Sequence, residues 1–128
     1  MGVIGFDQQV TFLLVADLEI STSFYRDALG LEIVLDQGDC RILRVTDTAF
    51  VGICERSDRP DPGAVLVTLV TDLVDERHQQ LTAAGVACEK PPQLNPHYNV
   101  YHAFYRDPDG FLVEIQQFRD QAWPRVDR

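Results

Sequence analysis

The hydrophobic and polar positions in the first half of the chain predict four short strands and one helix. Residues 10–15 are apolar apart from Thr11, which is typical of a strand covered on both faces. Asp17 follows as a candidate helix cap, and Ile20, Phe24 and Ala28 then recur every four residues, as on the buried side of a helix. Three further strands are predicted at residues 31–35, 41–46 and 50–54.

The second half of the chain repeats this plan. Residues 65–70 predict a strand, and Asp72 is the expected cap of a second helix. A proline-rich stretch, residues 91–98, is expected to be a loop, which would either cover a site or form a rigid surface connection. The remaining strands are predicted at residues 86–89, 100–106 and 111–118.

Two landmarks recur at one offset and indicate an internal duplication. Asp17 and Asp72 differ by 55 positions (72 − 17), and the glycines expected to end the two helices, Gly30 and Gly85, differ by the same 55 (85 − 30). We therefore predict an α+β fold of two tandem β-α-β-β-β modules, which form a curved mixed sheet around a cup-like cavity with the helices outside. Within one domain of residues 1–128, the modules are placed at about residues 8–56 and 64–118, with a tail at residues 119–128.

The sequence Asp-Pro-Asp-Gly at residues 107–110 predicts a hairpin with a three-residue loop. This loop sets the register of the two strands that it joins, so that Phe104 lies opposite Glu114 and His102 lies opposite Gln116. The side of the hairpin with these four residues is mixed, whereas the other side is apolar and is expected to meet a helix. Because the first strand of each module is largely apolar on both faces, we expect the mixed side to line a partly apolar cavity.

Composition narrows the range of partners. The chain has 128 residues, 45% of them hydrophobic, and a formal net charge of −9, which is unfavourable for binding nucleic acid or an anionic membrane. No segment has the length and apolar character of a signal peptide or a membrane span, so we expect a cytoplasmic protein. Cys40, Cys54 and Cys88 share no C-x-x-C spacing and are expected to be small buried hydrophobes rather than a disulfide framework, with a reactive thiol as the alternative.

The chain carries two extended motifs, V-x-D-L-x-x-S-x-x-F-Y-x-x-x-L-G-L and D-P-D-G-x-x-x-E. Their residues are Val15, Asp17, Leu18, Ser21, Phe24, Tyr25, Leu29, Gly30 and Leu31, then Asp107, Pro108, Asp109, Gly110 and Glu114. Together these motifs resemble the vicinal oxygen chelate superfamily, which includes glyoxalase, bleomycin resistance proteins, extradiol dioxygenases and fosfomycin-modifying enzymes. The resemblance covers about residues 10–118 and implies the duplicated fold, but one fold hosts many chemistries.

The resemblance also implies four metal-ligand positions, one on the first and one on the last strand of each module. They fall on Val10, Ile53, Val65 and Glu114, and of these side chains only the Glu114 carboxylate can bind a metal. Gln9 would supply a second ligand only if a bulge shifts the first strand by one residue. We therefore expect no cofactor, with a divalent metal as the alternative.

Three functions are compatible with these residues. The first is a metal-free protein that binds and sequesters a small organic molecule, and the second is a lyase, isomerase or dioxygenase of the same superfamily in which Glu114 and His102 are catalytic. The third is a structural dimerisation domain, and a homodimer is expected in any case. His97 and Tyr98 are candidate lid residues. The expected ligand-binding residues are Val10, Phe12, Ile53, Val65, Val67, His102, Phe104, Glu114 and Gln116.

Overall fold

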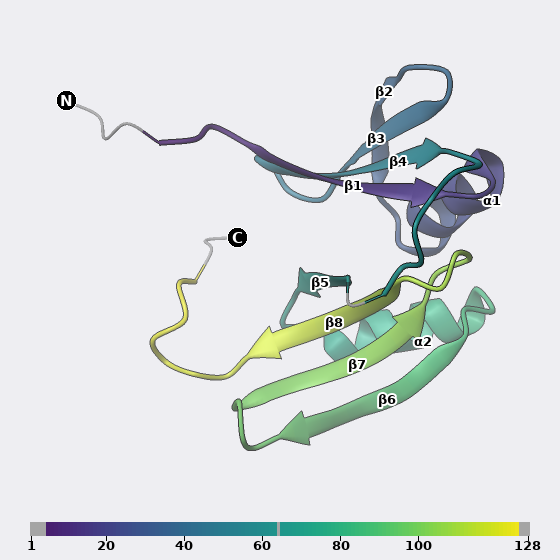
Figure 1. The fold of residues 1–128 in the computed structure, drawn as a ribbon. Helices are drawn as coiled ribbons and strands as arrows, with labels where there is room; N and C mark the ends of the chain where they lie inside the picture. Colours follow the sequence, from purple (N-terminus) through teal and green to yellow (C-terminus); the bar gives the residue numbers. More distant parts are fainter. Residues whose placement is uncertain (1–4, 64, 126–128) are drawn as a thin grey trace. The chain divides into compact units, whose positions relative to one another are not determined.

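The computed structural model describes residues 5–63 and 65–125 and consists of two compact units, residues 1–63 and 64–128 (Figure 1). Each unit is a four-stranded mixed sheet with helical segments on one face. The strand order is β1-β4-β3-β2 in the first sheet and β5-β8-β7-β6 in the second. The predicted α+β class and the repeated β-α-β-β-β plan are therefore confirmed. No helix among the described residues is long and apolar enough to cross a membrane.

The first unit contains five strand and helix elements of the repeat and one π-helical extension. They are β1 (Gln9–Val15), α1 (Leu18–Thr22), η1 (Ser23–Ala28), β2 (Glu32–Asp36), β3 (Cys40–Arg44) and β4 (Ala49–Glu55). β1 pairs in parallel with β4, whereas the β4-β3 and β3-β2 pairs are antiparallel. This arrangement leaves β1 and β2 at the two edges of the sheet.

Local signals at the ends of the first helical segment behave as predicted. The Asp17 carboxylate accepts a hydrogen bond from the backbone N–H of Ile20 at 3.0 Å, which satisfies a free donor of the first turn. Gly30 has a φ of 78° and ends the segment in the left-handed region. The predicted burial of Ile20 is wrong, since its side chain is 56% exposed, and Ser21 and Thr22 are buried in this turn instead.

The first sheet has one covered face and one open face. Ile53 is fully buried and pairs with Arg41, whose guanidinium donates to the Thr22 hydroxyl of α1 at 2.8 Å. Their common face is therefore the one covered by the helix. We call the opposite side of each sheet its open face. On the open face of the first sheet, Phe12 is 54% exposed and its ring crosses Gly52 of β4. A Cβ atom at Gly52 would overlap that ring, so glycine permits this close approach.

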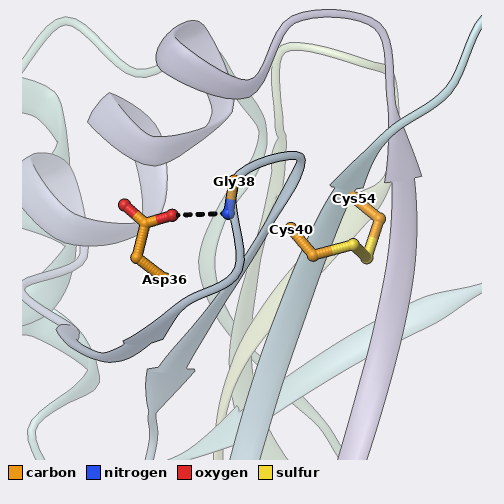
Figure 2. The surroundings of a disulfide bond; sticks show 4 residues. All are labelled: Asp36, Gly38, Cys40 and Cys54. Atoms are coloured by element: carbon orange, nitrogen blue, oxygen red, sulfur yellow. Dashed lines mark hydrogen bonds between the residues drawn. A yellow bond between two sulfur atoms is a disulfide. The ribbon is translucent and has the colours of Figure 1, made fainter.

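Cys40 and Cys54 form a disulfide between β3 and β4, so the prediction that they are unpaired small hydrophobes is wrong (Figure 2). The antiparallel register places the two residues directly opposite one another, with their Cα atoms 4.1 Å apart. The spacing in the sequence did not reveal this pairing, because it depends on how the two strands align. Cys88 is free, and burial raises the pKa of its thiol, which does not favour the reactive alternative.

The second unit repeats the arrangement of the first. Its elements are β5 (Leu66–Val70), α2 (Val74–Ala83), β6 (Cys88–Asn95), β7 (Val100–Arg106) and β8 (Leu112–Phe118). β5 pairs in parallel with β8, and the β8-β7 and β7-β6 pairs are antiparallel. α2 lies against β6, β7 and β8. The second unit thus has a helix-covered face and an open face of its own.

Two predictions for the second unit need correction. Asp72 does not cap α2, which begins at Val74 and has no side-chain cap. The proline-rich stretch is not mainly a loop, because β6 runs through Pro91 and Pro92 as far as Asn95. β6 is an edge strand whose register shifts twice near these prolines, and edges and irregular positions tolerate residues that cannot donate a backbone hydrogen bond.

The turn between β7 and β8 has the predicted form. The backbone N–H of Asp107 donates to the carbonyl of Phe111 at 3.0 Å, and Gly110 has a φ of 92°. The Asp107 carboxylate accepts hydrogen bonds from the N–H groups of Asp109 and Phe111 at 2.9 and 2.8 Å. The turn is therefore held by backbone and side-chain bonds together, and the register beyond it follows the prediction.

Two tyrosines of β7 attach the second sheet to α2. Tyr105 is fully buried, and its hydroxyl oxygen lies 2.7 Å from Nδ1 of His78. Burial raises the pKa of Tyr105. Tyr101 donates to the Asp75 carboxylate at 2.5 Å, and this hydrogen bond raises the pKa of Tyr101. Sequence reasoning did not identify either contact. These bonds fix the odd-numbered positions of β7 on the helix side, so the even-numbered positions lie on the open face.

Replacing both disulfide cysteines by serine is expected to lower the free energy of unfolding by about 3 kcal/mol, because the bond closes a loop of about 15 residues in the unfolded chain. Urea denaturation of the Cys40→Ser/Cys54→Ser variant checks this expectation. Cys88→Ser is the control and should change stability by less than about 0.5 kcal/mol. Equal stability of the double variant and the oxidised protein would contradict the structural role of the bond.

Candidate functional site

A cavity of about 460 Å³ lies on the open face of the second sheet. Its lining comes from β6, β7, β8 and the turn between β6 and β7, so every lining residue belongs to the second unit. The lining residues are Asn95, Tyr98, Val100, His102, Phe104, Glu114, Gln116 and Phe118. The volume lies within the range of about 300–1,000 Å³ that is usual for small-molecule sites.

Glu114 and His102 form the polar centre of this cavity. Nδ1 of His102 lies 2.5 Å from Oε2 of Glu114, and the Thr68 hydroxyl donates to Oε1 of Glu114 at 2.7 Å. Glu114 is 5% exposed and His102 is 8% exposed, so water contributes little to their solvation. A buried carboxylate is stable only when its oxygens accept hydrogen bonds, and here His102 and Thr68 supply them.

The register of the hairpin brings these groups together. Glu114 pairs with Phe104 across β7 and β8, whereas His102 pairs with Gln116, which makes Glu114 and His102 diagonal neighbours on one face. Diagonal neighbours are within reach of long side chains, and the observed rotamers close the gap. On the other side of Glu114, β5 pairs Thr68 directly with it.

Aromatic and amide side chains surround this polar centre. The ring of Phe104 contacts that of His102 edge to face, with centroids 4.7 Å apart. Phe118 is stacked on Trp123 of the tail at a centroid distance of 3.6 Å, so the tail supports one wall of the cavity. Gln116 is 8% exposed and adds an amide that can both donate and accept hydrogen bonds.

The structure brings four of the predicted site residues together in one cavity: His102, Phe104, Glu114 and Gln116. Tyr98, a predicted lid residue, also lines the cavity and is 68% exposed, whereas His97 does not line it. The remaining predicted residues lie elsewhere. Val10 and Phe12 belong to the open face of the first unit, and Val65 precedes β5.

Ile53 and Val67 lie on helix-covered faces rather than beside a cavity. Ile53 is fully buried next to Leu13, its parallel partner on β1. Val67 is 7% exposed and pairs with Val113, a fully buried residue of β8. Side chains alternate between the two faces of a strand, so Val67 does not share a face with the groups that line the cavity, and Ile53 belongs to the other sheet. Both belong to the apolar cores of their units.

A difference of one residue between the two modules accounts for the placement of Val67. Two residues, Ala16 and Asp17, connect β1 to α1, whereas three residues, 71–73, connect β5 to α2. Both strands end two residues before their aspartate (17 − 15 and 72 − 70), so the additional residue displaces β5 by one position relative to the start of its helix. Since strand side chains have a period of two, this displacement exchanges the faces and brings Thr68 to the open face in place of Val67.

Sequence reasoning missed several residues of the site. Thr68 lies in a predicted strand, but the constant offset of 55 residues placed Val65 and Val67, rather than Thr68, on the side expected to line the cavity. Alternation from His102 along the two hairpin strands could have identified others, because Val100 and Phe118 occupy even-numbered positions like Phe104 and Glu114. No signal of this kind was available for Asn95, since it lies in the stretch predicted to be a loop. The missed lining residues are Asn95, Val100 and Phe118.

The chain belongs to the Glyoxalase/Bleomycin resistance protein/Dioxygenase superfamily, whose family model matches residues 7–115. The uncharacterized protein YraH of Bacillus subtilis (strain 168) is 32% identical over 117 residues, which cover 80% of this chain and 91% of that protein. This relative extends the sequence similarity over most of the chain. The name of this relative states no activity, so the similarity indicates none for this chain.

Solved structures agree with this assignment. A glyoxalase/bleomycin resistance protein/dioxygenase from Nocardioides matches with a TM-score of 0.76 at 17% identity, covering 100% of this chain and 93% of that chain. Lactoylglutathione lyase from Agrobacterium tumefaciens matches with a TM-score of 0.71 at 26% identity, covering 89% of this chain and 95% of that chain. The first of these similarities shows the fold alone, because the identity is low.

The donor set of the cavity does not fit a divalent metal ion. No three His, Cys, Asp or Glu side chains gather as a metal-binding group in the described parts of the chain. His102 and Glu114 direct Nδ1 and Oε2 at each other, and Thr68 donates to the second carboxylate oxygen. Protein metal sites usually supply three or four ligands, and in this cavity the carboxylate and the imidazole already bind one another.

Thr68→Val is expected to lower the free energy of unfolding by about 1 kcal/mol, because it removes a hydrogen bond to a buried carboxylate while keeping the side chain branched. Thermal or urea denaturation measures the change. Thr11 is the matched position, because it is also an exposed threonine on an edge strand, β1. Thr11→Val therefore controls for the higher strand preference of valine. If both variants change stability equally, the bond between Thr68 and Glu114 contributes nothing.

Proposed function

We propose that this protein binds a small organic molecule in the cavity of its second unit and does so without a metal ion. The observation that carries this proposal is the buried Glu114–His102 pair, which lies in a cavity with otherwise mainly apolar and aromatic walls. Small-molecule sites combine such walls with a few fixed polar groups, which orient the ligand. The binding role is thus supported by the chemistry of the lining rather than by superfamily membership.

The apolar walls supply affinity in this proposal, and the polar groups supply orientation. Phe104, Phe118 and Val100 offer surface that is stabilised when a ligand displaces water from it. Asn95 and Gln116 offer amides that can form hydrogen bonds in either direction. A molecule with one or two rings and a few polar groups would satisfy both kinds of surface.

A second candidate is an enzyme of the same superfamily, and the hydrogen bond between His102 and Glu114 favours it. A carboxylate that holds one imidazole nitrogen leaves the other nitrogen to accept a proton from a bound substrate. Such a pair suits lyase or isomerase chemistry on a small oxygenated molecule. The similarity to lactoylglutathione lyase from Agrobacterium tumefaciens also favours this candidate.

Protein purified without chelators is expected to contain much less than one equivalent of divalent metal, as measured by elemental analysis.

The melting temperature of the protein should rise with at least one compound of a panel of α-keto, epoxide and hemithioacetal compounds, equally with and without EDTA. A ligand at about 100 times its Kd stabilises by about 2.7 kcal/mol. Phe104→Ala should lose the response, whereas Leu94→Ala, an exposed β6 residue outside the cavity lining, should keep it.

Three results would contradict the proposal in different ways. One equivalent of metal bound with micromolar or better affinity would exclude a metal-free site. Turnover of a panel compound by the wild type that is lost in Glu114→Gln would favour the enzyme. A dimer in sedimentation, with no ligand response from any compound, would favour the purely structural role.

A further inference from the structure

The contact between His102 and Glu114 determines which hydrogen-bonding group the cavity presents. An ionised carboxylate only accepts hydrogen bonds, so the proton between Oε2 of Glu114 and Nδ1 of His102 must come from the imidazole. The Thr68 hydroxyl occupies Oε1 of the same carboxylate and holds its orientation. In a neutral imidazole with its proton on Nδ1, the other nitrogen, Nε2, is an acceptor.

Nε2 of His102 remains for the ligand. Among residues 5–63 and 65–125, no protein group hydrogen-bonds this nitrogen, although the His102 side chain lines the cavity. The amides of Asn95 and Gln116 can each donate or accept, so they do not select between ligand donors and acceptors. The imidazole is therefore the group that discriminates, and it requires a donor on the ligand.

The walls indicate the kind of molecule that would carry this donor. Tyr98, Phe104 and Phe118 place three aromatic rings in the lining, and such rings favour flat aromatic partners in stacked or edge-to-face contact. The Phe104 ring also lies against the His102 ring, so a group that reaches Nε2 contacts aromatic surface at the same time. An aromatic hydroxyl combines a flat ring with a strong hydrogen-bond donor in one small unit.

We propose that the cavity selects an aromatic molecule bearing a hydroxyl group, whose O–H donates to Nε2 of His102 while its ring lies among Tyr98, Phe104 and Phe118. This inference rests on the proposed binding function and adds the class of ligand. Glu114 and Thr68 act as positioning residues, because they fix the imidazole without contacting the hydroxyl. A site built to receive a hydroxyl rejects the analogue that lacks the donor, since the acceptor is then left unpaired.

The test compares 2-naphthol with its methyl ether, 2-methoxynaphthalene, which has the same rings and oxygen but no O–H. Binding is measured by calorimetry and by naphthalene fluorescence at pH 8. For the wild type we expect a Kd for 2-naphthol at least about tenfold lower than that for the ether. Equal affinities would overturn the inference, and so would no binding of either compound.

Variants identify the acceptor. His102→Phe keeps a flat ring but removes Nε2, so its Kd values for the two compounds should agree to within about twofold, with binding of the ether retained. Glu114→Gln can donate to Nδ1, which moves the imidazole proton to Nε2, and it should also lose the preference for 2-naphthol. Leu94→Ala should keep the preference.

The outcomes separate this inference from the binding function on which it rests. If the naphthalene pair fails but a panel compound still raises the melting temperature through Phe104, the binding function stands and the ligand class is wrong. If no compound of either set binds, both proposals fail. A wild-type preference for 2-naphthol that persists in folded His102→Phe would locate the acceptor elsewhere and overturn the role of His102.

Discussion

The turn at residues 107–111 is the constraint on which the rest of the second unit depends. Its three-residue loop, braced by the Asp107 carboxylate, pins β7 against β8 in one register. That register places Glu114 and His102 on the open face and leaves the alternate positions to pack against α2. A slip of one residue would carry the carboxylate to the helix-covered face, where burial without partners is costly. The chemistry of the cavity is therefore a consequence of turn geometry.

The duplication shaped the scaffold more than the chemistry. Both units end their first helical segment at a left-handed glycine, Gly30 or Gly85, and both pair their first strand in parallel with their last. Their open faces nevertheless differ. In the first unit, the Phe12 ring crosses Gly52 of the last strand, whereas in the second unit Glu114 of the last strand is buried and paired with His102 of β7. The shift of β5 by one residue relative to the start of its helix is part of this divergence.

Sequence reasoning succeeded where a local rule determines the structure and failed where the alignment of distant strands does. The hairpin register and the glycine helix ends follow from conformational preferences of a few adjacent residues, and both are confirmed. The disulfide between Cys40 and Cys54 depends on the pairing of β3 with β4, which no local pattern specifies. The facing of Thr68 depends on the length of a connection that the repeat made appear constant. Disulfides are typical of oxidising compartments, whereas the sequence alone led us to expect a cytoplasmic protein. That location stays a prediction.

The most direct test of this account is nitrogen NMR spectroscopy of the His102 side chain at pH 8. The resonances of the three histidines are assigned with His78→Gln and His97→Gln variants. The account predicts that Nδ1 of His102 carries the proton and that Nε2 is unprotonated, because Glu114 accepts only from Nδ1. A proton on Nε2, or the mixture of both forms that a free imidazole shows, would contradict the central role of the Glu114–His102 contact.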